Sequence, residues 1–347
     1  MNFYTKQHAH YCGIDLHTRK MYVCIINQEG DIVLHKNIDT NPDIFMAIIQ
    51  PFRKGLVVGV ECMFTWYWIA DLCRKADIEF VLGHALYMKA IHGGKAKNDK
   101  IDSRKIALLL RGGMFPLAYV YPKKMRPTRD LLRRRNHFMR KRAELLAHIV
   151  NTGSQYNLDE PFGRIRRKNH REGMEERFVH PDVQKSIIAD MQMLDAYDKV
   201  IATMEYEIQK NAKHHDPVAY ALLRTLPGIG EILGLVILYE IGDINRFPRV
   251  QDFASYSRLV KSAKESNGKN YGTSGAKIGN AHLKWAFSEA AKLFVRWNGP
   301  AQRYKERLVR KHNKGKALSI LAHKLGRAVY YMLRNKEPFD QTRLLGY

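Results

Sequence analysis

Apolar and polar positions divide the first 122 residues into strands and helices. Three strand-like stretches lie within residues 10–38, and the turn between the last two spans Asn27–Gly30. The continuous apolar run at 55–62 predicts a buried central strand. A shorter strand is expected at 79–84, and helices at 43–52, 65–76, 85–94 and 100–113. Three antiparallel strands followed by alternating helices and strands indicate an α/β domain over residues 10–122.

The next segment, residues 123–215, is expected to be a helical connector. Residues 129–150 form a basic amphipathic helix, and residues 155–178 break the helical pattern, which predicts a loop that is mobile or ordered by a partner. Between 187 and 208, apolar residues recur every three or four positions, as in a coiled coil or a long antiparallel helix pair. An ordinary amphipathic helix packed on its own domain is the alternative. The recurring residues are Ile187, Met191, Leu194, Tyr197, Ile201, Met204 and Ile208.

Residues 216–347 are expected to form a mostly helical C-terminal domain. A helix, the turn Pro227–Gly230 and a second helix come first. Such turns can point the backbone N–H groups of Gly228 and Gly230 at a DNA phosphate, although a tight turn without a ligand has the same pattern. Residues 247–260 are predicted to be helical, and the Ser-, Gly- and Lys-rich stretch 261–280 to be a loop. Long helices at 281–297 and 317–335 close the domain.

Charge points to a polyanionic partner. The 347 residues include 58 Lys and Arg but only 34 Asp and Glu, a formal charge of +24, and the basic residues are spread along the chain. This favours DNA or RNA as the partner over a merely solvated or membrane-surface protein. No apolar run reaches the roughly 18 residues of a membrane span. The N-terminal residues lack the apolar segment of a signal peptide, so we expect a cytoplasmic protein.

The four cysteines give no sign of a metal site or a disulfide framework. They form no CxxC pair and lie in apolar surroundings, which predicts buried free thiols in a reducing compartment. They are Cys12, Cys24, Cys62 and Cys73.

Four carboxylates are the candidate chemical centre. Asp15 lies on the first strand, Glu61 ends the buried strand, and Asp99 and Asp102 begin a later helix. In a ribonuclease H-like sheet the first and fourth strands are neighbours and a late helix packs across their ends, so the four would converge. Because like charges oppose one another, such a cluster calls for a divalent cation, Mg²⁺ or Mn²⁺. Two such ions could assist phosphodiester cleavage.

Simpler structural roles are open for three of these residues. Asp99 and Asp102 could cap the helix start or complement its dipole, and Asp15 could form a turn. Glu61 is harder to explain in this way because it ends an apolar run. The nearby Lys97, Lys100 and Arg104 would hold a nucleic-acid backbone; these three form the basic flank of the site.

The chain resembles the insertion-sequence transposases with an Asp-Glu-Asp-Asp tetrad, which are bridge-RNA-guided DNA recombinases. The resemblance runs from about residue 10 to 335 and implies a RuvC-like ribonuclease H fold, a helical connector, and a C-terminal transposase domain bearing a nucleophilic serine. It places the tetrad on Asp15, Glu61, Asp99 and Asp102. The motifs that carry it are CGIDLH, GVEC, KNDKIDSRKIA, LLRTLPGIG and the Ser- and Gly-rich loop before AHLKWAF.

The same resemblance points to a serine in the loop before residue 281. Ser262, Ser266 and Ser274 are available, and Ser266 best matches the family position because Gly268 follows closely. Ser274 is the competitor. Lys269, Lys277 and Asn280 would then contact nucleic acid.

The resemblance also implies a bacterial or archaeal, nucleoid-associated protein, and it implies partners. These are a guide (bridge) RNA, donor and target DNA, and further copies of the chain, as a homodimer and as a tetramer in the synaptic complex. The acidic and serine halves of a site would meet across protomers, with the helix at 187–208 forming the dimer.

Two other function classes stay open. A metal-dependent, structure-specific nuclease of the Holliday-junction resolvase kind would use water and need only the carboxylates. A non-catalytic RNA- or DNA-binding protein would use the carboxylates structurally.

Overall fold

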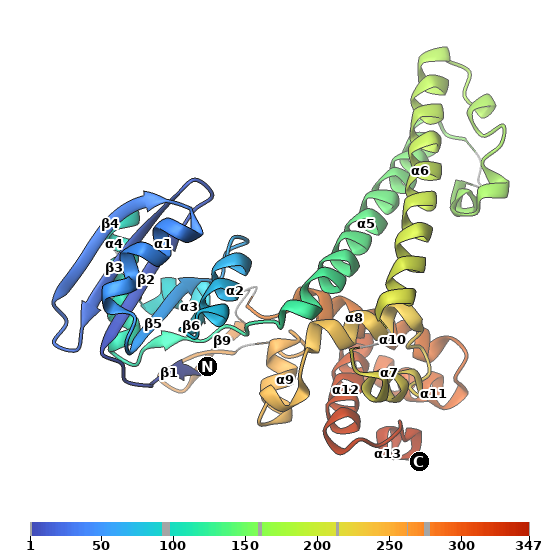
Figure 1. Ribbon diagram of the computed structural model, residues 1–347. Coiled ribbons are helices and arrows are strands. Elements are labelled where there is room, and N and C mark those ends of the chain that lie inside the picture. The colour runs from blue at the N-terminus through green and yellow to red at the C-terminus, as the bar shows by residue number, and fades with distance from the viewer. Residues whose placement is uncertain are drawn as a thin grey trace. The chain divides into compact units, whose positions relative to one another are not determined.

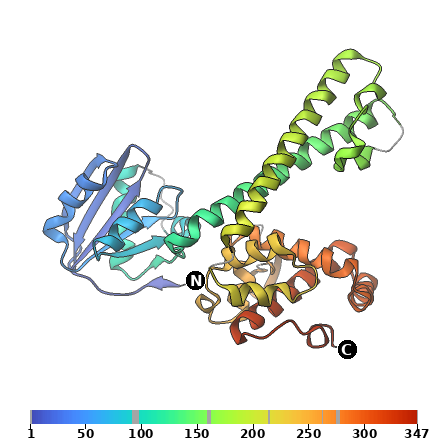
Figure 2. The ribbon, with the colours of Figure 1, turned by 45° about the vertical axis from the view of Figure 1, so that its right-hand side comes forward.

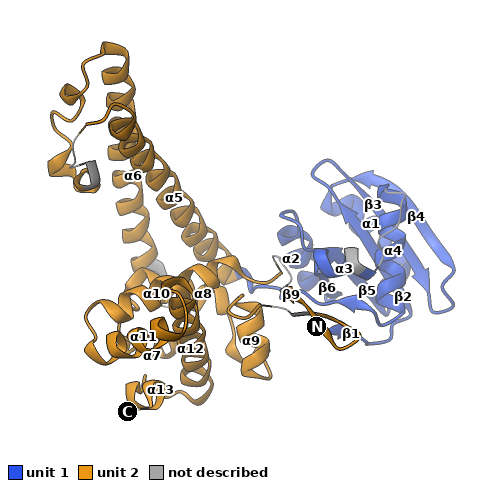
Figure 3. Cartoon of the chain, turned by 180° about the vertical axis from the view of Figure 1, so that it is seen from behind, with its two compact units in different colours: residues 1–123 blue, residues 124–347 orange. Residues whose placement is uncertain are grey.

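The computed structural model describes residues 2–91, 98–158, 162–212, 215–261, 263–273 and 278–346. The chain forms two compact units, Met1–Lys123 and Lys124–Tyr347, coloured separately in Figure 3. Each unit has its own hydrophobic core, and each is described by itself below.

Unit 1 is built on a five-stranded mixed sheet with the order β4-β3-β2-β5-β6 (Figure 1). Antiparallel pairing joins β2 to β3 and β3 to β4, whereas β5 runs parallel to both β2 and β6. The first and fourth predicted strands, β2 and β5, are therefore neighbours, and the α/β prediction is confirmed. The strands are β2 (His10–Leu16), β3 (Lys20–Asn27), β4 (Ile32–Asp39), β5 (Leu56–Glu61) and β6 (Glu79–Gly83). A two-stranded ribbon, β1 (Phe3–Tyr4) with β7 (Phe115–Pro116), was not predicted.

Helices cover both faces of this sheet. Side chains alternate along β2, so Cys12 and Ile14 join α1 and α2 in one buried cluster, while Tyr11 joins α4 in another. Three cysteines are buried as predicted, but Cys62 is exposed because it follows the end of β5. The helices are α1 (Pro42–Ile49), continued by the 3₁₀ turn η1 (Gln50–Phe52), α2 (Tyr67–Lys75), α3 (Ala85–Ile91) and α4 (Asp99–Arg111).

The 3₁₀ turn η2 (Lys123–Met125) spans the boundary between the units, and unit 2 continues with a long antiparallel helix pair, α5 (Arg126–Gln155) and α6 (Pro181–Ala212) (Figures 1 and 2). The apolar seam predicted between residues 187 and 208 is present on α6. Ile187, Leu194, Ile201 and Ile208 are buried at seven-residue spacing, as in a coiled coil. Their face packs on α5 of the same chain, so this seam is already occupied within the protomer.

Residues 162–178 form a cap on the helix pair, whereas the sequence predicted a loop that is mobile or ordered by a partner. It contains three 3₁₀ turns, η3 (Phe162–Arg166), η4 (Lys168–His170) and η5 (Glu175–Arg177). Ile165, Met174 and Phe178 are buried against the helix pair. The buried guanidinium of Arg171 pairs with Asp198 of α6 at 2.6 Å and with Asp195. These long-range contacts order a segment whose local sequence is polar.

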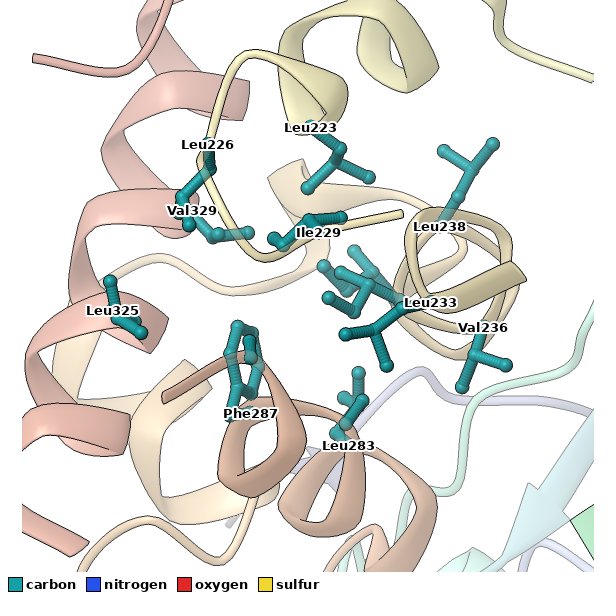
Figure 4. Close-up of a cluster of buried hydrophobic side chains, with 14 of the residues drawn as sticks. Leu223, Leu226, Ile229, Leu233, Val236, Leu238, Leu283, Phe287, Leu325 and Val329 are labelled. Atoms are coloured by element: carbon teal, nitrogen blue, oxygen red, sulfur yellow. The ribbon is translucent and has the colours of Figure 1, made fainter. Parts of the chain in front are cut away.

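The remainder of unit 2 is a helical bundle around α8. Every residue of α8 from Leu233 to Ile241 is buried, as expected for a helix surrounded by others (Figure 4). The elements are α7 (Pro217–Arg224), α8 (Glu231–Ile241), η6 (Ile244–Arg246), α9 (Val250–Tyr256), α10 (Ala281–Arg296), α11 (Gly299–Lys311), α12 (Lys314–Asn335) and α13 (Gln341–Leu345), with strands β8 (Ala263–Ser266) and β9 (Lys269–Thr273). None of the helices in the described part of the chain has the length and apolarity needed to cross a bilayer.

Candidate active site

The site begins at the edge of the sheet where β2 and β5 end side by side. Ile14 pairs with Val60 in the parallel ladder, and both side chains face the layer of α1 and α2. Because side chains alternate along a strand, the next residues, Asp15 and Glu61, lie on the opposite side, which α4 covers. The Asp15 side chain keeps 18% of its surface exposed, so it is sheltered but reachable by solvent.

Helix α4 brings the second acidic segment to this edge. Its backbone lies so close to β2 that a Cβ on Gly13 would overlap the Ser103 carbonyl oxygen and the Ala107 nitrogen. Only glycine permits this approach. The helix starts at an Asn98 cap, whose side-chain oxygen accepts a hydrogen bond from Ile101 N at 2.8 Å. Asp99 and Asp102 therefore occupy its first turn, as the spacing predicted.

Two of the predicted carboxylates and one histidine form a cluster. In the described part of the chain, one group of potential metal-binding side chains has its ligand atoms within 4.8 Å of one another, namely Asp15, His17 and Asp99. His17 Nε2 lies 3.5 Å from Asp15 Oδ1 and 3.6 Å from Asp99 Oδ1. Ligands about 2.1 Å from an octahedral ion lie about 3.0 Å apart when adjacent and about 4.2 Å apart when opposite. The two printed separations lie between these values, so small side-chain shifts would let the three groups share a divalent cation.

Glu61 and Asp102 lie outside this group. Asp102 is one turn along α4 from Asp99, and its Oδ1 lies 3.5 Å from Lys105 Nζ. Glu61 is half-buried at the end of β5. The structure therefore brings Asp15 and Asp99 together but not all four carboxylates, and the tetrad as a complete ligand set stays a prediction.

Sequence reasoning missed His17, although a signal was present. His17 follows Asp15 by two positions, and residues two apart in extended chain share a side. The tight turn after β2 fixes it, because His17 N donates to Lys20 O at 3.2 Å and its carbonyl accepts from Thr40 Oγ1 at 3.0 Å. An imidazole favours softer ions than Mg²⁺, so a mixed set with two carboxylates also suits Mn²⁺.

Basic side chains flank the cluster. Lys100 and Arg104 are exposed on α4, where they could contact phosphates, and Lys97 lies outside the described residues. The Lys100 carbonyl lies 3.0 Å from Nε2 of His35 on β4, a contact that ties the start of α4 to the sheet. Burial lowers the pKa of His35, which favours its neutral form as hydrogen-bond partner.

Ser266 lies on a β-hairpin, which corrects the predicted loop. Asn267 has φ 51° and Gly268 has φ 69°, and two consecutive positive φ values are what a type I′ hairpin turn requires. Ser266 pairs with Lys269 across the turn, so the exposed hydroxyl and the lysine side chain share a face. Ser262, Ser274 and Lys277 lie outside the described residues, so the two competing serines and this lysine contact stay predictions.

Asn280 is a buried helix cap, not an exposed nucleic-acid contact. Its Oδ1 accepts hydrogen bonds from His282 N and Leu283 N at the start of α10, and its Nδ2 donates to Glu240 Oε2 at 2.7 Å. Glu240 also accepts hydrogen bonds from Arg133 Nε at 2.6 Å and from Arg129 Nε at 3.2 Å. Burial alone would raise the pKa of Glu240, but the two guanidiniums and Asn280 outweigh it and hold that pKa at about 2.

The Pro227–Gly230 turn has a packing reason for its first glycine. Gly228 has φ 94°, and a Cβ there would lie 2.6 Å from Phe294 N on α10. Gly230 is the exposed N-cap residue of α8 and has open space around it. Gly228 is therefore explained without a ligand, whereas Gly230 could still approach a phosphate.

Comparisons with known proteins agree with this layout. A model of the DEDD transposase domain of the IS110 group, described as a transposase, matches residues 12–156. A second, described as a transposase of the IS116/IS110/IS902 family, matches residues 220–306. The first match includes the acidic cluster, and the second includes the β8–β9 hairpin.

Full-length similarity gives the same result. The transposase for insertion sequence element IS1111A of Coxiella burnetii is 19% identical over 336 residues, which span 94% of this chain and 90% of that protein. An uncharacterized 44.8 kDa protein of insertion element IS116 from Streptomyces clavuligerus is 24% identical over 148 residues, 42% of this chain and 36% of that protein. The protein is a transposase, an enzyme that cuts and rejoins DNA. It belongs to the IS110/IS116 family of insertion-sequence transposases.

Proposed function

We propose that this transposase is an RNA-guided DNA recombinase that exchanges strands through a covalent link between Ser266 and DNA. Unit 1 is then a RuvC-like ribonuclease H fold, in which Asp15, Glu61, Asp99 and Asp102 bind Mg²⁺ or Mn²⁺. One observation carries the proposal. The Asp15–His17–Asp99 cluster lies where two parallel strands end beneath the first turn of α4.

The residues of unit 1 suit a metal centre that acts on a phosphodiester. Asp15 and Asp99 would supply oxygen ligands and His17 a nitrogen. Glu61, at the end of the adjacent strand, and Asp102, one turn along α4, would complete the set. When bound, a divalent cation stabilises charge on the phosphate oxygens and lowers the pKa of an attacking hydroxyl. Lys100 and Arg104 would hold the strand on either side, since both are exposed cations on α4.

Ser266 would provide the nucleophile. Its Oγ forms a bond to phosphorus while one ester oxygen of the DNA leaves and takes up a proton, and the serine proton passes to solvent or a base. A DNA hydroxyl later attacks the phosphoserine, restores Ser266 and rejoins the strand. Because each step exchanges one phosphate ester for another, the reaction needs no external energy source. Lys269, on the same face of the hairpin, would neutralise phosphate charge.

Partners follow from the family resemblance and the charge. A guide RNA would specify the donor and target DNA by base pairing, so the protein would need mainly backbone contacts, which suits the formal charge of +24. The active form would be a homodimer, and a tetramer in the synaptic complex, acting in the cytoplasm. Because α5 already covers the apolar seam of α6, a dimer would use the outer faces of the helix pair.

Trapping the covalent link tests the proposal. Wild-type protein incubated with RNA, DNA and Mg²⁺, then denatured, should yield a protein–DNA adduct whose attached peptide contains Ser266. Ser266→Ala should give no adduct. Ser288→Ala is the matched control and should still give one, because Ser288 lies on α10, where its hydroxyl donates to Lys284 O. Cleavage without an adduct would instead establish the water-using nuclease, and an adduct on Ser274 would move the nucleophile.

Mixing two inactive variants tests the composite site. If the acidic and serine halves come from different protomers, Ser266→Ala mixed with Asp99→Asn should regain part of the activity. A mixed dimer then has one site with both defects and one with neither. Native mass spectrometry must show that mixed assemblies form. A silent mixture with mixed assemblies present would place both halves of the site in one chain.

A further inference from the structure

The end of α10 exposes a tryptophan in an unusual way. Trp297, the residue that follows the last turn of α10, has 86% of its surface accessible, and the guanidinium of Arg296 lies 5.2 Å from the centre of its ring. A large aromatic ring left in water is unfavourable, and such rings are typical of binding surfaces. The neighbouring Phe294 and Val295, by contrast, are buried.

The next helix, α11, carries a stripe of cations. Arg303, Arg307 and Arg310 recur at i, i+4 and i+7, so they share one face of the helix, and all three are exposed. Ala301, on the opposite face, is fully buried, and the half-buried ring of Tyr304 lies between the two faces, 5.5 Å from the Arg307 guanidinium. Further exposed basic residues continue the stripe into the start of α12, namely Lys311, Lys314 and Lys316.

One acidic residue, the exposed Glu306, lies a helical turn from Arg303 and from Arg310, so the stripe keeps a net positive charge but is not wholly free of acidic neighbours. Among the described residues, Arg303, Arg310, Lys311, Lys314 and Lys316 form no ion pair with a carboxylate. Arginines elsewhere in the same unit are paired, as Arg135 is with Glu205 and Arg142 with Asp198. Like charges one turn apart on a helix repel one another, so the stripe weakens α11 unless a polyanion covers it.

The exposed ring and the start of the stripe are adjacent in the fold. Two residues separate α10 from α11, and Gln302 Nε2 donates to Arg296 O at 3.3 Å across the connection. Asn298 fixes the turn between them, because its Oδ1 accepts from Ala301 N at 3.0 Å and its Nδ2 donates to Gln341 Oε1 at 2.6 Å. Figure 2 shows this part of the chain, coloured orange near residue 300, at the outer edge of unit 2.

We infer that this α10–α11 surface binds an unpaired stretch of DNA strand, with one base stacked on Trp297 and the phosphates lying along the stripe. A duplex would present its phosphates to the stripe but would leave Trp297 without a partner, because paired bases are stacked on one another. An unpaired base offers a free face, and stacking on an aromatic ring is how single strands are commonly held. The strand is DNA because DNA is the substrate that this enzyme cuts and rejoins.

Binding of a fluorescein-labelled oligothymidylate to the full-length protein tests the inference. The buffer contains EDTA, so no strand is cut and the outcome does not depend on Ser266 or the acidic cluster. Trp297→Ala should weaken binding by about 5- to 150-fold, the range for loss of one stacked base. Trp297→Phe, which keeps an aromatic face, should retain most of the affinity. Binding of a matched duplex should be the same for all three proteins.

The stripe has a separate test. For Arg303→Gln/Arg310→Gln, the slope of log Kd against log salt should fall by about 1.4, since each phosphate contact on a single strand contributes about 0.7. Arg74→Gln/Lys75→Gln, which removes two exposed cations from α2 in unit 1, is the charge-matched control and should leave the slope unchanged. Circular dichroism confirms that each variant is folded.

Three results would overturn the inference. The first is equal affinity of wild-type protein and Trp297→Ala for the oligothymidylate. The second is the same loss of salt dependence in the control as in the arginine variant. The third is much tighter binding of oligouridylate than of oligothymidylate at this surface, which would make the partner RNA.

Discussion

Glu240→Gln should destabilise unit 2 by about 3 kcal/mol. The carboxylate is buried at the junction of α5, α8 and α10, where it accepts hydrogen bonds from Arg129, Arg133 and Asn280. Glutamine has nearly the same shape but no charge. Two guanidiniums, one of them well buried, would then be left without their counter-charge, and breaking a buried pair in this way typically costs about 3–5 kcal/mol.

The pKa of Glu240 gives an independent magnitude. It falls from an ordinary 4.5 to about 2, because the guanidinium contacts outweigh the burial that would raise it. At about 1.4 kcal/mol for each tenfold change in proton affinity, the ionised form contributes about 3 kcal/mol to folding. Since the folded pKa is the lower one, this stabilisation is complete above about pH 4.5. It is lost as the pH falls from there to about 2.

Urea unfolding of the wild type and the variant, followed by circular dichroism from pH 7 to pH 2, measures both effects. The difference between the two proteins should be about 3 kcal/mol at pH 7 and should shrink toward zero near pH 2. Glu205→Gln, which removes the partner of Arg135 at a partly exposed position, should cost no more than about 1 kcal/mol. A difference between wild type and Glu240→Gln that stayed constant with pH would refute the charge argument. Equal losses for Glu240→Gln and Glu205→Gln would show that burial does not matter here.

Two further predictions concern packing. Gly13→Ala should destabilise unit 1 by about 1–3 kcal/mol, because the new Cβ would meet the α4 backbone. Gly59→Ala should cost less, because its Cβ would meet the Leu110 side chain. Thermal unfolding of the two variants measures the difference. Leu194→Ala should cost about 2–5 kcal/mol in the α5–α6 pair, whereas Met193→Ala, at an exposed neighbour, should cost little. Hydrogen exchange of the α6 amides compares Leu194→Ala with Met193→Ala. Equal protection in the two variants would contradict the placement of Leu194 in the buried seam.

The parts of the fold that follow from hydrophobic period were predictable. The continuous run of β5 and the seam at 187–208 were recognised because burial on one or both sides imposes a strict spacing. The order of the strands along the chain predicted that β2 and β5 are neighbours in the sheet. The sequence alone therefore places Asp15 and Asp99 on one edge of the sheet.

The missed features depend on polar contacts between distant residues. The β8–β9 hairpin has the Asn267-Gly268 turn signal, but its strands lack alternating apolar residues, so composition alone indicated a loop. The cap around Arg171 is ordered by Asp195 and Asp198, which a local pattern cannot reveal. Glu240 was detectable in principle. It lies in an apolar helix, and the same argument that marked Glu61 predicts that such a carboxylate has a buried partner.

The candidate functional side chains lie where the backbone has the least freedom. Asp99 is held at the sheet edge because Gly13 lets the α4 backbone touch β2, and Ser266 stands at the rim of a turn that needs two positive φ values. Both arrangements tolerate few substitutions, and neither requires the functional residue itself to contribute to packing. This separation explains how exposed or half-exposed polar groups, which add little to stability, can still be positioned for chemistry. It also means that Ser266→Ala and Asp99→Asn should remove activity without unfolding the chain, so a loss of function in these variants can be interpreted as a loss of chemistry.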